Sequence, residues 1–261
     1  MKAVRVTAQR GGTFDIAPLP LPTVQRKGAG DSASNMSRQP CDALRAIVLS
    51  DGPFKGLAAQ PGSLLTFVVS GDLTLSAGQQ SCALAPGDIL LTDDPSASKI
   101  TLDVRNQGRL LQVVVPSNWP QPDAKVQQPG TFIPRPGPTP KLKRLYEGKD
   151  GKAYFTEFRE LFPDIRNRWS EPRPASGFRM ISRETGETDW HPSGNGHLGF
   201  LSCGDMEVEV GGGGGAIEHF YAGDLSLAED FNGQGHIVRA HGYIHLTNIH
   251  IELENLWPYK L

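Results

Sequence analysis

Short apolar runs separated by turn residues dominate the chain. From Ala43 the runs are RAIVLS, SLLTFVVSG, DLTLSA, CALAPGDILLT, KITLDV and RLLQVVVP, and a similar series begins at Ser176. Glycine, proline, asparagine or aspartate stands between most of them. Short strands with turn signals at this spacing are typical of a β-sandwich or β-barrel. We therefore predict an all-β chain.

Two stretches interrupt the strand pattern and divide the chain. Residues 1–42 form a predicted N-terminal arm, with a strand at VRVTA and a polar loop over Lys27–Gln39 that we expect to be mobile. Residues 117–141 are rich in proline and predict an interdomain linker. The predicted β-domains are then residues 43–116 and 142–261. Inside the second, the apolar residues over 154–162 have roughly helical spacing, but a turn at Lys149–Gly151 comes first, so we predict a short strand or turn followed by one helical turn.

An internal repeat links the two predicted domains. Residues 65–94 and 198–231 each contain an apolar strand, a Gly-Asp pair, an alternating strand, a hairpin, a second Gly-Asp pair and an apolar strand that ends in acidic residues. Such self-similarity predicts two copies of one β-domain. We expect the first glycine of each copy to provide the left-handed backbone of a tight turn. The pairs are Gly71-Asp72 and Gly87-Asp88 in the first copy, and Gly204-Asp205 and Gly223-Asp224 in the second.

Composition narrows the range of partners. The chain has 261 residues, of which 38% are hydrophobic, enough for one large domain or two of ordinary size. Its net charge of −2 is dispersed, so we expect no nucleic-acid partner. No apolar run approaches a membrane span, and the start lacks the apolar core of a signal peptide. Because Cys41, Cys82 and Cys203 form no CxxC pair, we expect no disulfide framework and a cytoplasmic protein.

Two segments of the second copy resemble the motifs of the cupin superfamily. DWHPSGNGHLGFLSCGDMEVEV is similar to the first cupin motif, and AGDLSLAEDFNGQGH is similar to the second. The resemblance covers about residues 142–253 well and residues 43–116 more loosely. The C-terminal half also resembles small single-domain bacterial and fungal cupins of unassigned function. This resemblance implies a bicupin, with two tandem double-stranded β-helix (jelly-roll) barrels joined by the proline-rich linker.

The resemblance also implies a metal site in the second barrel only. By position, His191, His197 and His236 would hold one divalent transition metal, either Fe, Mn, Ni, Cu or Zn. Asp189 would orient an imidazole or complete the ligand set. The chain departs from the family pattern at His197, where a glutamate is usual. The corresponding positions of the first copy are apolar, and no histidine precedes His191, so we expect no metal there; these positions are Ala58, Leu64 and Ile100.

Function is less constrained than fold. The leading hypothesis is a metal-dependent enzyme acting on a small polar or aromatic molecule, with dioxygenase as the first reaction class by analogy and isomerase or lyase close behind. The alternative is a non-catalytic binding or sensing protein in which the histidines are incidental. Glu229 and Asp230 are predicted as carboxylates at the rim or in a turn. A homodimer is compatible with the sequence. Candidates for the mouth of the barrel, where they would favour an anionic ligand, are Arg179, Arg183, Arg239 and His250.

Overall fold

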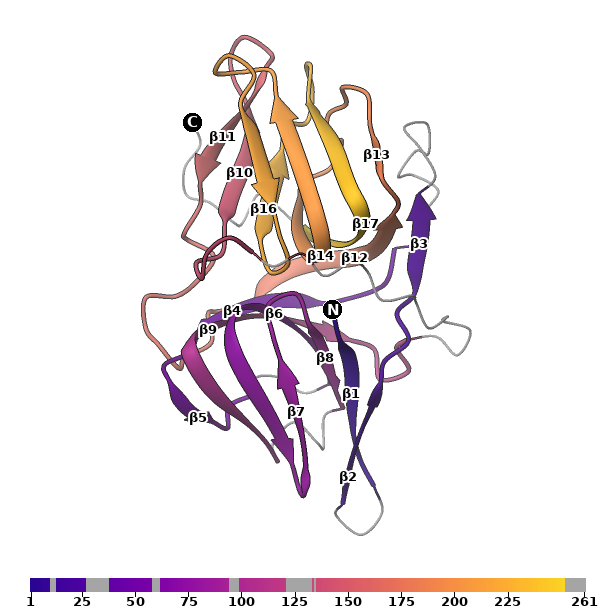
Figure 1. Ribbon diagram of the computed structural model, residues 1–261, viewed down its shortest axis with the longest axis vertical. Coiled ribbons are helices and arrows are strands. Elements are labelled where there is room, and N and C mark those ends of the chain that lie inside the picture. The colour runs from indigo at the N-terminus through magenta and orange to yellow at the C-terminus, as the bar shows by residue number, and fades with distance from the viewer. Residues whose placement is uncertain are drawn as a thin grey trace. The chain divides into compact units, whose positions relative to one another are not determined.

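The computed structural model describes residues 1–9, 13–26, 38–57, 62–93, 99–120, 133 and 135–251. Most of the loop predicted over Lys27–Gln39, and most of the predicted linker, lie outside these residues. The described part is built from strands and contains no helix, as Figure 1 shows, so none there is long and apolar enough to cross a membrane. The prediction of an all-β chain is confirmed.

The chain divides into two compact units. Unit 1 comprises Met1–Pro22, Pro40–Pro129 and Glu160–Arg173, and unit 2 comprises Thr23–Gln39, Gly130–Arg159 and Pro174–Leu261. Each unit therefore includes a short segment that the predicted domain bounds assigned elsewhere.

The strands are numbered in the order of the chain and are divided between the two units. Unit 1 contains β1 (Ala3–Ala8), β2 (Phe14–Pro18), β4 (Ala43–Val48), β5 (Gly52–Phe54), β6 (Ser63–Ala77), β7 (Gln80–Leu84), β8 (Ile89–Thr92) and β9 (Ile100–Val115). Unit 2 contains β3 (Thr23–Arg26), β10 (Leu142–Glu147), β11 (Ala153–Glu157), β12 (Arg173–Arg183), β13 (Gly186–Glu187), β14 (His197–Val210), β15 (Ile217–Phe220), β16 (Leu225–Glu229) and β17 (His236–Ile251).

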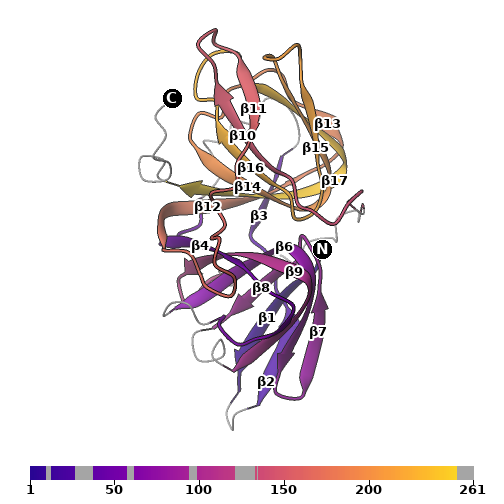
Figure 2. The same cartoon turned by 90° about the vertical axis from the view of Figure 1, so that its left-hand side faces the viewer.

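The two units share one strand-pairing scheme. In unit 1 the long strands β6 and β9 pair antiparallel, β6 also pairs with β7 and β8, and β8 pairs parallel with β1 (Figure 2). In unit 2, β14 pairs with β17, β15 and β16 in the same way, and β16 pairs parallel with β10. Leu64 faces Thr92 and Val114, and the corresponding His197 faces Ala228 and His250. The predicted repeat is thus matched by the pairing registers.

The first glycine of each repeat lies within a long strand and not in a hairpin turn, so that part of the prediction is wrong. Gly71 and Gly204 have left-handed φ values of 91° and 88°, as expected. However, each lies where the pairing register shifts, between Ser70 and Asp72 in β6 and between Cys203 and Asp205 in β14. These irregularities bend strands that continue on both sides, as β-bulges do.

The second Gly-Asp pair of each repeat fixes the start of a parallel strand. Asp88 accepts hydrogen bonds from the main-chain N–H groups of Ala85 (2.9 Å) and Lys2. Asp224 accepts them from the main-chain N–H groups of Tyr221 (2.8 Å) and Lys141 (2.8 Å). Both carboxylates therefore connect a turn to the residue before β1 or β10.

Two segments contact strands that are far from them in sequence. β3 pairs parallel with β12, and in the segment assigned to unit 1 the Asn167 N–H donates to Val48 O at 2.7 Å. The short strand predicted in this stretch is confirmed, because residues 153–157 form β11 and pair antiparallel with β10. The helical turn predicted after it is wrong, because residues 158–162 contain a turn and a bend. The inner face of unit 2 is defined by its core cluster, Leu145, Ala153, Leu201, Met206, Val208, Val210, Phe220, Ala240 and Ile244.

Candidate histidine site in unit 2

His236 begins β17 on the inner face of unit 2. Side chains alternate along a strand, so His236 shares its side with Val238 and Ala240, which pack in or against the core. It is buried, and its Nδ1 lies 2.7 Å from Oδ2 of Asp230, whose side chain has no exposed surface. Asp230 was predicted as a rim or turn carboxylate, whereas here it is an internal partner of a predicted ligand.

Asp230 is held from a second direction by Ser193. The Ser193 hydroxyl donates to Oδ1 of Asp230, and the Ser193 N–H donates to the Asp230 carbonyl at 2.9 Å. Burial by itself raises the pKa of Asp230, but the hydrogen bond and charge of His236, with the Ser193 hydroxyl, lower it overall. Asp230 is therefore an anion at neutral pH, and it favours the His236 tautomer with its proton on Nδ1.

His191 lies directly against His236. The two residues exchange main-chain hydrogen bonds of 2.9 and 3.1 Å, and their ring centroids are 4.7 Å apart with 44° between the planes. Gly235 permits this approach, because a Cβ there would lie 2.1 Å from the His191 carbonyl oxygen. Nδ1 of His191 is 2.9 Å from the Asp189 carbonyl oxygen. The Asp189 contact is thus made by its main chain, and the residue itself is exposed.

His197 begins β14 and lies within electrostatic reach of His236 and Asp230. Its Nδ1 is 3.0 Å from the Asn195 carbonyl oxygen. Burial lowers the pKa of His197, and the positive charges of His236 and Arg179 act in the same direction. The ring is therefore neutral at pH 7, which is the form that binds metals.

The three imidazoles share a tautomer but do not form a complete ligand set. Each has an oxygen beside Nδ1, which assigns the ring proton to Nδ1 and the lone pair to Nε2. Yet no three His, Cys, Asp or Glu side chains of the described ranges lie close enough together to hold a metal ion. His191 and His236 fit as two imidazole ligands, because their rings are in contact and their tautomers are the ligating ones.

The predicted arginines occupy two faces. Arg179 lies opposite Asn248 and Arg183 opposite Ile244, on the inner face. Arg239 alternates with Val238 and Ala240, so its side chain lies on the opposite face, and its assignment to the mouth of a barrel is wrong. His250 pairs with His197 through the backbone, while its side chain lies outside the described residues.

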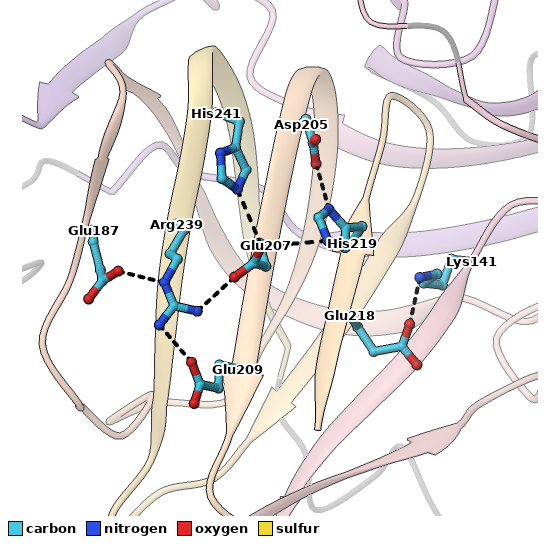
Figure 3. Close-up of polar contacts among 9 residues, drawn as sticks. All are labelled: Lys141, Glu187, Asp205, Glu207, Glu209, Glu218, His219, Arg239 and His241. Carbon is cyan, nitrogen blue, oxygen red and sulfur yellow. Dashed lines mark hydrogen bonds and ion pairs between the residues drawn. The ribbon is translucent and has the colours of Figure 1, made fainter. Parts of the chain in front are cut away.

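The outer face carries an ion-pair network centred on Arg239 (Figure 3). Arg239 contacts Glu187 at 2.5 Å, Glu207 at 2.7 Å and Glu209 at 2.6 Å. His219 and His241 also approach Glu207, at 3.5 and 3.4 Å. The hydrogen bonds that Arg239 donates to the three glutamates raise its pKa, and Arg239 stays charged. His219 and His241 belong to this network and are therefore on the opposite face of the sheet from His236.

Comparison with known proteins gives distant likenesses. No family model matches the chain, and no curated protein matches it. Similar solved structures include a cupin 2 conserved barrel domain protein from Leptotrichia buccalis (11% identity, TM-score 0.38, covering 88% of this chain and 92% of that one). They also include a protein of unknown function from Pseudomonas syringae (14%, 0.37, 95% and 100%) and oxalate decarboxylase from Bacillus subtilis (13%, 0.29, 88% and 78%), whose description names Mn(II) centres. At these scores no chemistry is carried over from them.

Proposed function

We propose that the chain is a bicupin in which unit 2 binds a divalent transition metal and acts on a small polar or aromatic molecule. The metal would be held by His191 and His236 and completed by His197. Unit 1 would serve as structural support. In unit 1, Leu64 and Ile100 are fully buried, and all histidines of the chain lie within unit 2, which supports this division. Ala58 lies outside the described residues.

The observation that carries the proposal is the buried Asp230–His236 pair beside His191. A carboxylate on Nδ1 of an imidazole fixes the ring and raises the basicity of Nε2, and this arrangement recurs behind metal-ligating histidines. Neutral imidazoles suit the late first-row metals and iron. A bound ion would supply Lewis acidity or activation of dioxygen. The residues themselves fix the orientation of the His236 ring and place its proton on Nδ1, which leaves the lone pair on Nε2.

Dioxygenase activity is the first reaction class to test. Three imidazoles would leave positions on an octahedral ion for a substrate and for dioxygen, which is why this class precedes isomerase and lyase. Dioxygen uptake by the metal-loaded protein with candidate small molecules would identify it. An isomerase or lyase would convert the same molecules without uptake.

A second candidate is a metal-free binding protein. It is favoured by the finding that, among the described residues, no group of three His, Cys, Asp or Glu side chains is placed to hold a metal ion. In this alternative, the inner-face histidines and arginines would bind an anionic ligand directly.

Metal content distinguishes the two candidates. The full chain would be stripped with a chelator, reconstituted separately with Fe²⁺, Mn²⁺, Ni²⁺, Cu²⁺ and Zn²⁺, desalted and analysed by mass spectrometry. We expect stoichiometric uptake of at least one metal, lost in His236→Ala and retained in His241→Ala, a histidine of the same strand on the outer face. Trace metal in the reconstituted wild type would reject the metalloenzyme and leave the binding protein.

A further inference from the structure

A polar row crosses four strands on the inner face of unit 2. Arg179 on β12 pairs with Asn248 on β17, Asn248 pairs with Gly199 on β14, and Gly199 pairs with Ser226 on β16. Residues in register across adjacent strands have side chains on the same side of the sheet. Two residues further along, Leu201 and Leu246 pack in and against the core. The row is therefore on the inner side, like His236.

Asn248 provides a buried acceptor without a donor. Its Oδ1 is buried and has no hydrogen-bond partner among the described residues. Buried polar atoms in native proteins nearly always have a partner, so an orphaned acceptor indicates a group that binds there. Gly199 brings this oxygen near the Ser226 hydroxyl. A Cβ at position 199 would lie 2.7 Å from Ser226 Oγ and 3.5 Å from Asn248 Oδ1.

Arg179 adds a positive charge at the end of the row, and the row lies beside one of the predicted histidines. Gly199 is two residues from His197 on β14, so both lie on the inner side of the sheet. A guanidinium matches the geometry of a carboxylate and can bind it with two hydrogen bonds. The row thus combines a carboxylate-binding group, an acceptor awaiting a donor, and a neighbouring imidazole.

We propose that this row, Arg179–Asn248–Gly199–Ser226, is a subsite for a small carboxylate that carries a hydroxyl or amino group on the adjacent carbon. Arg179 binds the carboxylate, and Asn248 Oδ1 accepts a hydrogen bond from the neighbouring O–H or N–H. The inference deepens the proposed function by naming its substrate class and rests on it for the chemistry next to His197. Binding itself does not require the metal.

Three acids of equal carbon number test the subsite by calorimetry with the full chain. Lactate, alanine and propionate differ only in carrying a hydroxyl, an ammonium or a hydrogen on the carbon next to the carboxylate, and both enantiomers of the first two would be used. We expect one enantiomer of lactate or alanine to bind about tenfold or more tightly than propionate, the effect of one hydrogen bond in a buried site. Comparison of the lactate and alanine titrations identifies the donor.

Variants test separately how Arg179 and Asn248 contribute to binding. Asn248→Ala should remove the preference over propionate, while Arg179→Gln should weaken all three acids by about tenfold or more. Asn248→Asp keeps an acceptor but adds a negative charge, so it should weaken lactate and propionate even if Asn248→Ala folds poorly. Arg239→Gln, an arginine on the outer face, is the matched control and should bind as the wild type does. Thermal melting verifies that each variant is folded.

The result that would overturn the subsite is wild-type protein that binds none of the acids, or binds propionate as tightly as the other two. Unchanged binding by both Arg179→Gln and Asn248→Asp would overturn it as well. Running the titrations with stripped and with reconstituted protein separates the two proposals. If the protein takes up no metal but binds the acids in a way that depends on Arg179 and Asn248, the metal proposal alone is refuted. If the protein takes up stoichiometric metal but does not bind the acids in this way, the subsite alone is refuted.

Discussion

Nδ1 of His236 lies 2.7 Å from the carboxylate of Asp230, a side chain with no exposed surface. Ser193 holds the other carboxylate oxygen, so Asp230 has little freedom to turn away. The consequence is a ring whose orientation and tautomer are set before any ligand binds. A candidate metal ligand that is positioned in this way loses less entropy on binding.

Asp230→Asn should therefore weaken metal binding without removing a ligand. The carboxamide retains the shape but not the charge, and lost partners of ligating imidazoles typically cost about 10–100-fold in metal affinity. Competition with a chromogenic chelator would measure this. Asp189→Asn is the matched control, since Asp189 contacts His191 through its carbonyl oxygen, and it should leave the affinity unchanged. Equal affinities for wild type and Asp230→Asn would contradict the positioning role.

Asp88 and Asp224 predict a matched pair of stability effects. Each carboxylate accepts two main-chain N–H groups, whereas asparagine offers one acceptor oxygen and turns an N–H₂ toward the other donor. Asp88→Asn and Asp224→Asn should each cost about 1–3 kcal/mol of unfolding free energy. Asp224→Asn should cost more, because Asp224 also pairs with the largely buried Arg135 at 3.4 Å.

Hydrogen exchange would locate these effects. Asp88→Asn should raise exchange mainly in β1 and β8, and Asp224→Asn mainly in β10 and β16, because those are the strands that each carboxylate connects. Asp164→Asn, an exposed position of unit 1, should change neither region. Wild-type exchange in both buried variants would show that the carboxylates are not structural.

The fold was predictable to the extent that it depends on local pattern. Alternation and turn residues predicted the strands, and the Gly-Asp repeat predicted two copies of one β-domain. The sequence could not show that Gly71 and Gly204 lie in bulges, because a left-handed glycine suits both a turn and a bulge and the partner strand decides. Likewise, the helical spacing around Phe158 was overridden by the pairing of β11 with β10.

The sequence predicted which histidines belong to the site, but not which carboxylate contacts them. The spacing of the motifs picked out His191 and His236, and the structure places their rings together. Asp189 was chosen as the orienting carboxylate because it is two residues from His191. Instead, Asp230 orients the His236 ring. The only sequence signal for this was the position of Asp230 in the turn, six residues before His236. Whether a carboxylate points inward depends on how the turn folds back, which local sequence does not determine.

The burial of Asp88 gives a pH dependence with a definite sign. Burial raises the pKa of Asp88 above its ordinary 3.8, more than the N–H groups of Lys2 and Ala85 lower it. In the range just above 3.8 the folded chain therefore binds more protons than the unfolded chain, and stability falls as pH rises. Asp88→Asn cannot titrate. The stability of the wild type relative to this variant should decrease as pH rises through that range.

Urea unfolding of both proteins from about pH 3.5 to about pH 6.5 would measure this difference. Titrating groups common to the two proteins cancel in the comparison, so the slope reports Asp88. A wild-type advantage that grows with pH would mean that the folded pKa lies below 3.8, and that the two main-chain donors outweigh burial.

The network around Arg239 should contribute little to stability despite its three glutamates. The contacts lie on the outer face, where solvent screens them, and exposed ion pairs are typically worth about 0–1 kcal/mol. Arg239→Gln should thus lower the unfolding free energy by about 1 kcal/mol or less, and the loss should shrink as salt screens the repulsion left among the glutamates. Metal uptake should be unchanged, because the inner face is untouched. A loss well above this size that persists at high salt would show that the network is a structural element and not a solvated surface.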